Sequence, residues 1–138
     1  MQFTNPDDLA IRDFLQRIRR IAVLGLSPNQ HRPSYHVSAH MQRFGYDIVP
    51  VRPGVASVLG QPAYAHLQDV PGRVELVNVF RNANELDTIV ENCISLGMPA
   101  IWIQQGIINE AAACRARDAG LFVVMDRCIY IDYLHLCL

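Results

Sequence analysis

Five short stretches of the chain are apolar at nearly every position, which is typical of strands covered on both faces. They lie at residues 21–26, 46–51, 75–80, 100–103 and 121–125. Most segments between them place apolar residues three or four positions apart, as at Val37, Met41 and Phe44, and this spacing predicts helices. Buried strands that alternate with amphipathic helices predict an α/β fold, a doubly wound parallel sheet of about five strands.

Two further segments complete the predicted order of elements. The apolar positions from Ile11 to Ile18 predict a helix over roughly residues 6–19, with Asn5 as its cap and Pro6 as its first residue. Residues 53–74 are interrupted by prolines and glycines and predict a loop, with at most a short helix near 64–67. With 138 residues, 51% of them hydrophobic, we expect one domain over residues 1–138.

Charge narrows the function classes. The 12 basic and 13 acidic residues give a net charge of −1, so the chain offers no basic field for nucleic acid, and we expect no such partner. Every basic residue is Arg. The absence of Lys from the sequence excludes a Walker phosphate loop, a pyridoxal Schiff base and a lysine nucleophile. Arginine holds carboxylates and phosphates, so an anionic ligand fits this composition.

Metal and membrane sites are not predicted. Cys93, Cys114, Cys128 and Cys137 form no C-x-x-C pair, and the His36–His40 pair lacks the Glu of H-E-x-x-H and a third ligand. The sequence contains no apolar stretch long enough to cross a membrane and no signal-peptide pattern at its start. We therefore expect a cytoplasmic protein with reduced thiols and no membrane partner.

The segment after the first apolar run has the position of a ligand-binding loop, because the first strand-to-helix turn flanks the crevice of such sheets. It runs from Gly25 to Tyr35 and matches the dinucleotide pattern G-x-G-x-x-G only at Gly25, since Ser27 and Gln30 stand at the other two glycine positions. The segment is also longer than that pattern. A tight turn of the nicotinamide-binding type is therefore disfavoured.

The same segment predicts an anion site at the start of the next helix. Pro33 has no amide hydrogen and suits the first helical position. The amides near Ser34 and Tyr35 would then lie at the positive end of the helix dipole, with the Arg32 guanidinium and the Ser27 and Ser34 hydroxyls beside them. The plainer alternative is an ordinary turn, with Ser34 as a capping side chain.

Arg52 follows the second predicted strand, where enzymes that use NAD place an acidic residue on the ribose. A cation there suits a phosphorylated ribose, as in NADP or the 3′-phospho-ADP end of coenzyme A (CoA). The spacing alone fits a solvated surface arginine equally well.

Several motifs together resemble a known family. They are IAVLGLSP at 21–28, RPSY at 32–35, GY and VPV within 45–51, VNVFR at 77–81, IWIQQG at 101–106 and VVMDRC at 123–128. This set resembles the small standalone CoA-binding proteins, which are similar to the N-terminal CoA-binding domain of the succinyl-CoA synthetase α subunit. The resemblance covers almost the whole chain.

The resemblance implies a Rossmann-like domain that holds CoA by its diphosphate at the first loop. The positions that carry over are Ser27, Arg32, Pro33 and Ser34. Arg52 departs from the Asn that the family has at that place.

Topology adds candidates at the ends of the later strands. Phe80 and Arg81 end the third predicted strand, where Phe80 could wall an adenine pocket. Gln104 and Gly106 end the fourth and face the crevice from the other side. Cys128 follows the fifth strand, where a thiolate favoured by Arg127 could form a mixed disulfide with CoA. A partly buried, inert cysteine is the alternative.

These observations favour a non-catalytic module that binds CoA or acyl-CoA. Two alternatives stay open: a small NADP-dependent oxidoreductase in which Arg52 holds the 2′-phosphate, and a thiol redox sensor that uses Cys128. The tail 129–138 is strongly apolar and packs either across its own sheet or against a second subunit. From the second possibility we expect a homodimer.

Overall fold

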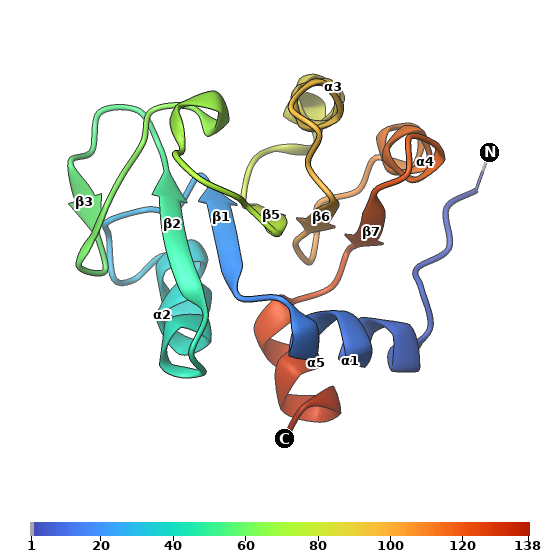
Figure 1. Ribbon diagram of the computed structural model, residues 1–138, viewed down its shortest axis with the longest axis horizontal. Helices are drawn as coiled ribbons and strands as arrows, with labels where there is room; N and C mark the ends of the chain where they lie inside the picture. Colours follow the sequence, from blue (N-terminus) through green and yellow to red (C-terminus); the bar gives the residue numbers. More distant parts are fainter. Residues whose placement is uncertain (1) are drawn as a thin grey trace.

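A five-stranded, entirely parallel sheet forms the centre of the protein (Figure 1), whose computed structural model describes residues 2–138. The strand order is β2-β1-β5-β6-β7. The strands are β1 (Arg20–Leu24), β2 (Asp47–Val51), β5 (Leu76–Val79), β6 (Ala100–Ile103) and β7 (Phe122–Met125). Nearly every strand position is buried, which confirms the predicted doubly wound α/β fold and its strands to within two residues at each end.

Helices cover both faces of the sheet. In Figure 1, α3 and α4 lie on one side, and α1, α2 and α5 lie on the other. The helices are α1 (Asp8–Arg17), α2 (Pro33–Arg43), α3 (Leu86–Ser95), α4 (Glu110–Asp118) and α5 (Ile129–Leu136). Alternate residues of each strand face opposite layers, so the sheet separates two hydrophobic cores.

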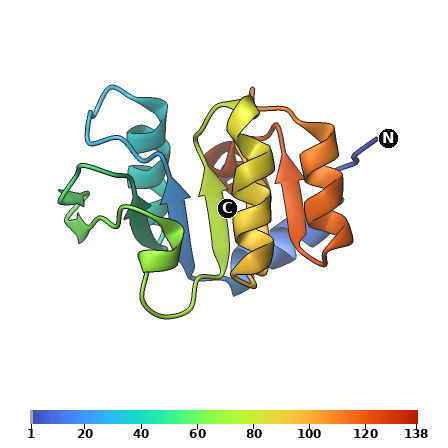
Figure 2. The ribbon, with the colours of Figure 1, turned by 90° about the horizontal axis from the view of Figure 1, so that it is seen from above.

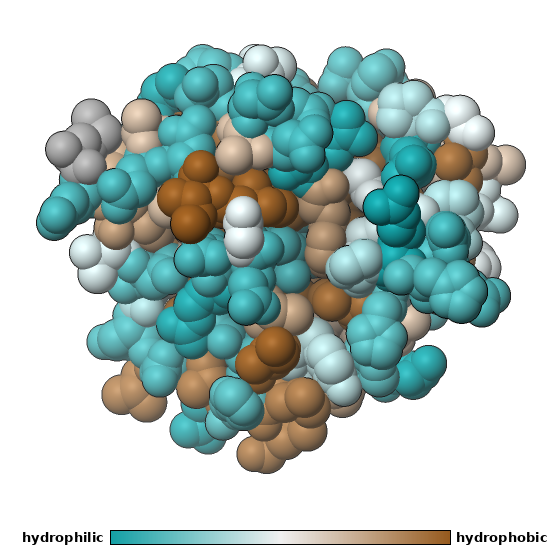
Figure 3. Space-filling view, turned by 180° about the vertical axis from the view of Figure 1, so that it is seen from behind, coloured by the Kyte–Doolittle hydropathy of each residue, from teal (hydrophilic) through white to brown (hydrophobic). Residues whose placement is uncertain are grey.

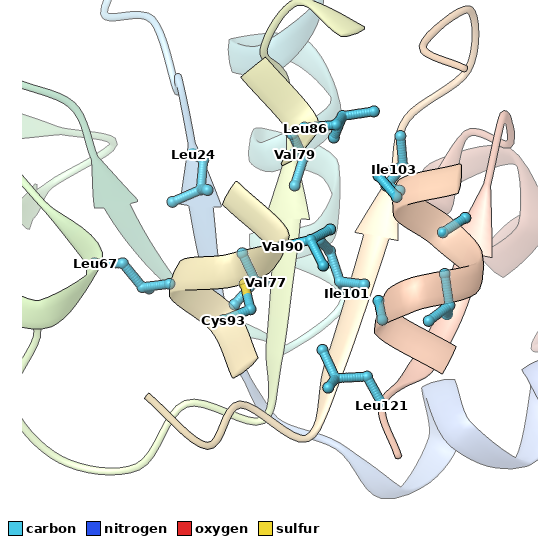
Figure 4. Packing of buried hydrophobic residues seen from close by; sticks show 14 of the residues in the cluster. Leu24, Leu67, Val77, Val79, Leu86, Val90, Cys93, Ile101, Ile103 and Leu121 are labelled. Carbon is cyan, nitrogen blue, oxygen red and sulfur yellow. The ribbon is translucent and has the colours of Figure 1, made fainter. Parts of the chain in front are cut away.

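The core on the α3 and α4 side shows this alternation directly. Figure 4 shows Val77 and Val79 of β5 and Ile101 of β6 pointing toward Leu86 and Val90 of α3. All five side chains are completely buried. The opposite core holds Trp102, whose indole nitrogen donates a hydrogen bond of 2.8 Å to the Arg127 carbonyl. Packing on both faces explains why the strand sequences are continuously apolar.

The strand order reverses between β1 and β5. The chain passes from β1 outward to β2, returns across β1 to β5, and then continues to β6 and β7 on the other side. All strands point the same way, and the loops after β1, β5 and β6 gather along the upper edge in Figure 2. In open parallel sheets this edge, at the reversal of strand order, is where ligands bind.

The predicted cap of the first helix is wrong. Asp7 caps α1, and its carboxylate accepts a hydrogen bond of 2.8 Å from the Ala10 amide. Asn5 instead pairs with the backbone of Met125, to whose carbonyl it donates at 2.9 Å and from whose amide it accepts at 2.8 Å. Because β7 is an edge strand, its unpaired backbone groups provide a partner that the local sequence around Asn5 does not reveal.

Residues 53–74 form mostly loop, as predicted, but they also contain a small antiparallel pair of strands. The pair joins β3 (Ser57–Val58) to β4 (Gln61–Pro62). A single 3-10 turn spans Leu67–Asp69, slightly later than the short helix expected near 64–67, and Leu67 anchors it in the core.

The apolar tail forms α5, which packs on the chain's own sheet beside α1 and α2. Ile129 is fully buried, whereas Ile131 and Leu138 remain exposed. On the face shown in Figure 3, apolar side chains form separate groups among polar ones. Packing within one chain accounts for most of the apolar character of the tail, and the homodimer remains a prediction. Within residues 2–138, no helix has the length and apolar character needed to span a membrane.

Glu75 ties the starts of β1 and β5 together at the opposite edge of the sheet. Its Oε1 accepts hydrogen bonds of 2.9 Å from the amides of both Arg19 and Arg20. The Arg20 bond is the main cause that lowers the pKa of Glu75, and the Arg19 bond adds to it, while partial burial opposes both. A lowered pKa in the folded state means that these bonds stabilise the fold when the carboxylate is ionised.

We expect Glu75→Gln to lower the free energy of unfolding by about 1 kcal/mol at neutral pH, because the bonds to a charged acceptor are lost at a partly exposed site. The deficit should shrink as the pH falls below the ordinary glutamate value of 4.5, since the wild-type carboxylate then becomes protonated as well. Urea unfolding across this pH range measures both effects. Asp13→Asn is the control, because its ion pair with Arg17 is exposed and its loss should change little. A deficit independent of pH would contradict this role of Glu75.

Candidate functional site

A cavity of about 880 Å³ opens at the carboxyl edge of the sheet, where the strand order reverses. Its lining comes from the loops that follow β1, β2, β5, β6 and β7. Ten of the eleven ligand-binding residues predicted from the sequence line it, as does the predicted thiol: Gly25, Ser27, Arg32, Pro33, Ser34, Arg52, Phe80, Arg81, Gln104, Gly106 and Cys128. The fold thus brings together residues that lie more than one hundred positions apart.

Tyr35 does not line the cavity. It is the third residue of α2, and its half-buried side chain packs against the core on the α1 and α5 side. Its backbone belongs to the first turn of the helix, whereas its side chain points toward the core. The sequence analysis places Tyr35 in the site through the amides at the start of this helix. Its side chain lies away from the cavity, and its backbone amide at the third helical position stays a predicted contact.

Gly25 allows the β1 loop to pass directly beside the end of β5. Its φ of +81° lies in the left-handed region that favours glycine. A Cβ at this position would lie 2.5 Å from the Phe80 carbonyl oxygen and 2.8 Å from Cδ of Arg81. Any larger residue would therefore force the two chain segments apart at the floor of the cavity.

Side-chain acceptors shape the loop between Gly25 and α2. The Ser27 amide donates to Ser34 Oγ at 3.0 Å, and the Asn29 amide donates to Ser27 Oγ at 3.1 Å. Both serines are nearly buried. Each hydroxyl accepts a backbone hydrogen bond and keeps its own hydrogen available as a donor. Ser34 therefore stabilises the loop and does not cap the helix. The residue at the cap position of α2 is Arg32, whose side chain makes no capping hydrogen bond.

The first turn of α2 borders the cavity. Pro33 is its first residue, as predicted, and both Pro33 and Ser34 line the cavity. The amides at the second and third positions of a helix have no carbonyl one turn earlier to accept their hydrogens. Together with the helix dipole, these amides favour an anion at this point.

Three arginines contribute charge to the lining. Arg81 is neutralised by Glu85, with its Nη2 at 2.8 Å from Oε1, and this bond lowers the pKa of Glu85. Within residues 2–138, the Arg52 guanidinium donates only to the Gly25 carbonyl, at 3.4 Å. No carboxylate within residues 2–138 pairs with Arg32 or Arg52. Two uncompensated positive charges therefore face one end of the cavity.

At the opposite end, after β6 and β7, the described lining residues carry no charge. Gln104 is almost fully buried there, and its Oε1 accepts a hydrogen bond of 3.2 Å from the Ile129 amide at the start of α5. The Gly106 amide donates to Asp126 at 2.7 Å, which fixes the loop after β6. Cys128, half-buried, completes this end of the lining.

Arg127 does not face the cavity as the sequence suggested. Its guanidinium is paired with Asp132 at 3.0 Å and with Asp8 at 3.4 Å, and these bonds raise its pKa. Asp132 is nearly buried, so the pair fastens the start of α5 to α1. The proposed effect of Arg127 on the Cys128 thiol is thus not supported by the geometry, because Asp132 compensates the charge.

Sequence reasoning missed Asn29, Glu85 and Ile107, which also line the cavity. Glu85 lies four residues after Arg81. Opposite charges at this spacing pair where the chain enters a helix, so the spacing could have identified Glu85 from the sequence.

The His36–His40 pair lies outside the cavity lining. The His40 ring stacks on Tyr130 of α5 with centroids 4.1 Å apart, and burial, His36 and Arg43 lower its pKa. Among the described residues 2–138, no three His, Cys, Asp or Glu side chains are grouped closely enough to hold a metal ion.

Comparison with known proteins identifies the family. The CoA-binding domain model matches residues 19–133. The uncharacterized protein YneT of Bacillus subtilis (strain 168) is 40% identical over 129 residues, which cover 94% of this chain and 96% of YneT. A hypothetical protein from Pyrococcus horikoshii OT3 superposes with a TM-score of 0.90 at 33% identity, covering 99% of each chain.

A more distant structure shares the fold alone. It is an acetyl-coenzyme A synthetase from Candidatus Korarchaeum cryptofilum in complex with phosphate and ADP, with a TM-score of 0.71 at 18% identity. The match covers 83% of this chain and 28% of the synthetase chain. The family match over most of the chain supports CoA binding in general, and the chain belongs to the CoA-binding domain family.

Proposed function

We propose that the protein binds CoA or an acyl-CoA in the cavity at the carboxyl edge of its sheet, as a binding module that performs no reaction on it. One observation carries this proposal: the first turn of α2 and two uncompensated arginines, Arg32 and Arg52, meet in one cavity at the reversal of strand order. In this fold, that position is the usual place for a nucleotide.

The donors of the cavity match the acceptors of CoA. CoA carries a diphosphate and a 3′-phosphate at its nucleotide end, and a neutral pantetheine arm with a thiol at the other. The α2 amides, Arg32 and the two serine hydroxyls suit the diphosphate. A volume of about 880 Å³ lies within the range for small-molecule sites of roughly 300–1,000 Å³.

The two ends of the cavity give the ligand one preferred direction. Arg52 and Phe80 would receive the phosphorylated ribose and the adenine, because a guanidinium suits the 3′-phosphate and an aromatic ring suits a base. The neutral end, with Gln104, Gly106 and Cys128, would receive the pantetheine arm. This direction keeps the ligand's charge beside the unpaired arginines.

The character of the lining supports binding without a reaction. Glu85 is the one carboxylate among the described lining residues, and its ion pair with Arg81 holds it. Apart from the Cys128 thiol, the remaining polar groups are amides, hydroxyls and guanidinium groups, which anchor a ligand but do not exchange protons with it near neutral pH.

We expect isothermal titration to show binding of CoA, and we expect Arg32→Gln to weaken it roughly 10- to 100-fold, because the variant loses a charge-assisted bond to the diphosphate. Arg12→Gln is the matched control. Arg12 is an exposed arginine on α1 that does not line the cavity, so its removal changes the net charge equally without touching the site. Equal losses in the two variants would show that the effect is one of overall charge and would contradict the proposed site.

We expect Arg52 to recognise the 3′-phosphate. Wild-type protein should bind dephospho-CoA roughly tenfold more weakly than CoA, and Arg52→Gln should bind the two ligands about equally, because the 3′-phosphate then has no cation to contact. Titration of both proteins with both ligands gives the coupling directly.

A full preference for CoA in Arg52→Gln would assign the 3′-phosphate to another group. Parallel titrations with NADP and NAD test the ligand class. Tight binding of NADP without binding of CoA would overturn the proposed function.

A further inference from the structure

Cys128 is the one described cysteine that lines the large cavity. Cys93 and Cys114 are buried, and burial raises the pKa of Cys93 to about 12. Cys137 is half-buried like Cys128, but it lines a separate hollow of about 200 Å³ beside Tyr46 and Tyr133. The chain therefore holds two half-buried cysteines, of which Cys128 lines the proposed ligand cavity and Cys137 does not.

The neighbouring side chain of Gln104 marks the same end of the cavity as a ligand-contacting surface. Gln104 is 4% exposed and lines the cavity. Its carbonyl oxygen is held by the amide of Ile129, the residue that follows Cys128. This bond orients the amide group and leaves the two hydrogens of Nε2 without a protein acceptor within residues 2–138. A donor that has accessible surface in a cavity and no protein partner is free to bind an acceptor from a ligand.

The position of Cys128 relative to the arginines sets which part of the ligand it meets. Arg32 and the first turn of α2 follow β1, whereas Gln104 and Cys128 follow β6 and β7. A ligand anchored by its diphosphate at α2 extends its neutral arm across the end of β5 toward this thiol. The amide carbonyls of a pantetheine arm are acceptors of the kind that Gln104 Nε2 requires.

We propose that Cys128 is a covalent capture site for CoA disulfides, where the protein forms a mixed disulfide with CoA. The proposal rests on the proposed function, because the nucleotide end of the ligand must first bind at α2. The co-reactant is a disulfide of CoA, either symmetric or with another small thiol.

The reaction is a thiol–disulfide exchange. The Cys128 thiol loses its proton, and the sulfur attacks the CoA-side sulfur of the disulfide. The Cys128–CoA sulfur bond forms as the original sulfur–sulfur bond breaks. The leaving thiolate takes up a proton, so Cys128 is oxidised by the same two electrons that reduce the departing thiol. No further oxidant is needed, and a thiol reductant reverses the step.

Binding of the nucleotide end distinguishes this site from an accidentally accessible thiol. A ligand held at α2 keeps its sulfur near Cys128 at an effective concentration far above that in solution. Glutathione disulfide has the same reacting bond but no nucleotide, so it gains no such advantage. The proposal thus predicts a preference for CoA disulfide at Cys128 and none at Cys137.

The test incubates reduced full-length protein with CoA disulfide or glutathione disulfide at equal concentration and follows adducts by intact-protein mass spectrometry with peptide mapping. We expect the CoA adduct to form at Cys128 at least about tenfold faster than the glutathione adduct. Arg32→Gln should slow only the CoA reaction, and excess acetyl-CoA, whose sulfur is blocked, should slow it as well. Cys137→Ser should keep the full rate, and Cys128→Ser should form no adduct with CoA.

Equal rates for the two disulfides, or a CoA adduct mapped to Cys137, would overturn the proposal. Mapping on the wild-type protein decides this even if Cys128→Ser fails to fold. Titration of the reduced protein with CoA in the presence of reductant separates the two failures. Binding without an adduct at Cys128 removes the capture site and leaves the proposed function, whereas an absence of binding removes both.

Discussion

The approach of the β1 loop to the end of β5 at Gly25 is the constraint on which the site depends. A Cβ there would lie 2.5 Å from the Phe80 carbonyl oxygen, so the two loops can share one edge only if this position carries no side chain. The left-handed φ of Gly25 turns the chain away from the sheet and toward α2. This one turn places the α2 amides and Arg32 at the cavity. It also brings the Gly25 carbonyl within hydrogen-bond distance of Arg52.

A chain without lysine builds its anion site from backbone and arginine. Backbone amides at a helix start are fixed by the fold, and a guanidinium keeps its charge at every physiological pH. The loop supports them with Ser27 and Ser34, whose oxygens accept loop amides and keep the turn open in front of α2. The result is a site whose geometry comes from hydrogen bonds within the loop, so loop order and ligand binding are expected to be coupled.

The sequence was sufficient for what depends on periodicity and topology. Continuous apolar runs located the strands, Pro33 located the start of α2, and parallel topology predicted that residues as distant as Gly25 and Cys128 would share an edge. The errors arose where a side chain pairs with a residue far along the chain, because the local sequence does not show that partner. Asn5 pairs with Met125 at the β7 edge, 120 positions away, and Arg127 pairs with Asp8, 119 positions away, as well as with the nearby Asp132.

The ligand direction in the proposed function rests on which arginines of the cavity are neutralised. Arg81 lies in the lining but is paired with Glu85, and Arg20, Arg115 and Arg127 are paired with carboxylates away from the cavity. Arg32 and Arg52 are the arginines of the described lining that have no carboxylate partner within residues 2–138. Shape alone would let a long ligand enter the cavity either way round. The positive charge at the β1 and β2 end favours phosphates there, and under the proposed function an uncharged, thiol-bearing arm would then lie at the end where Gln104 and Cys128 line the cavity.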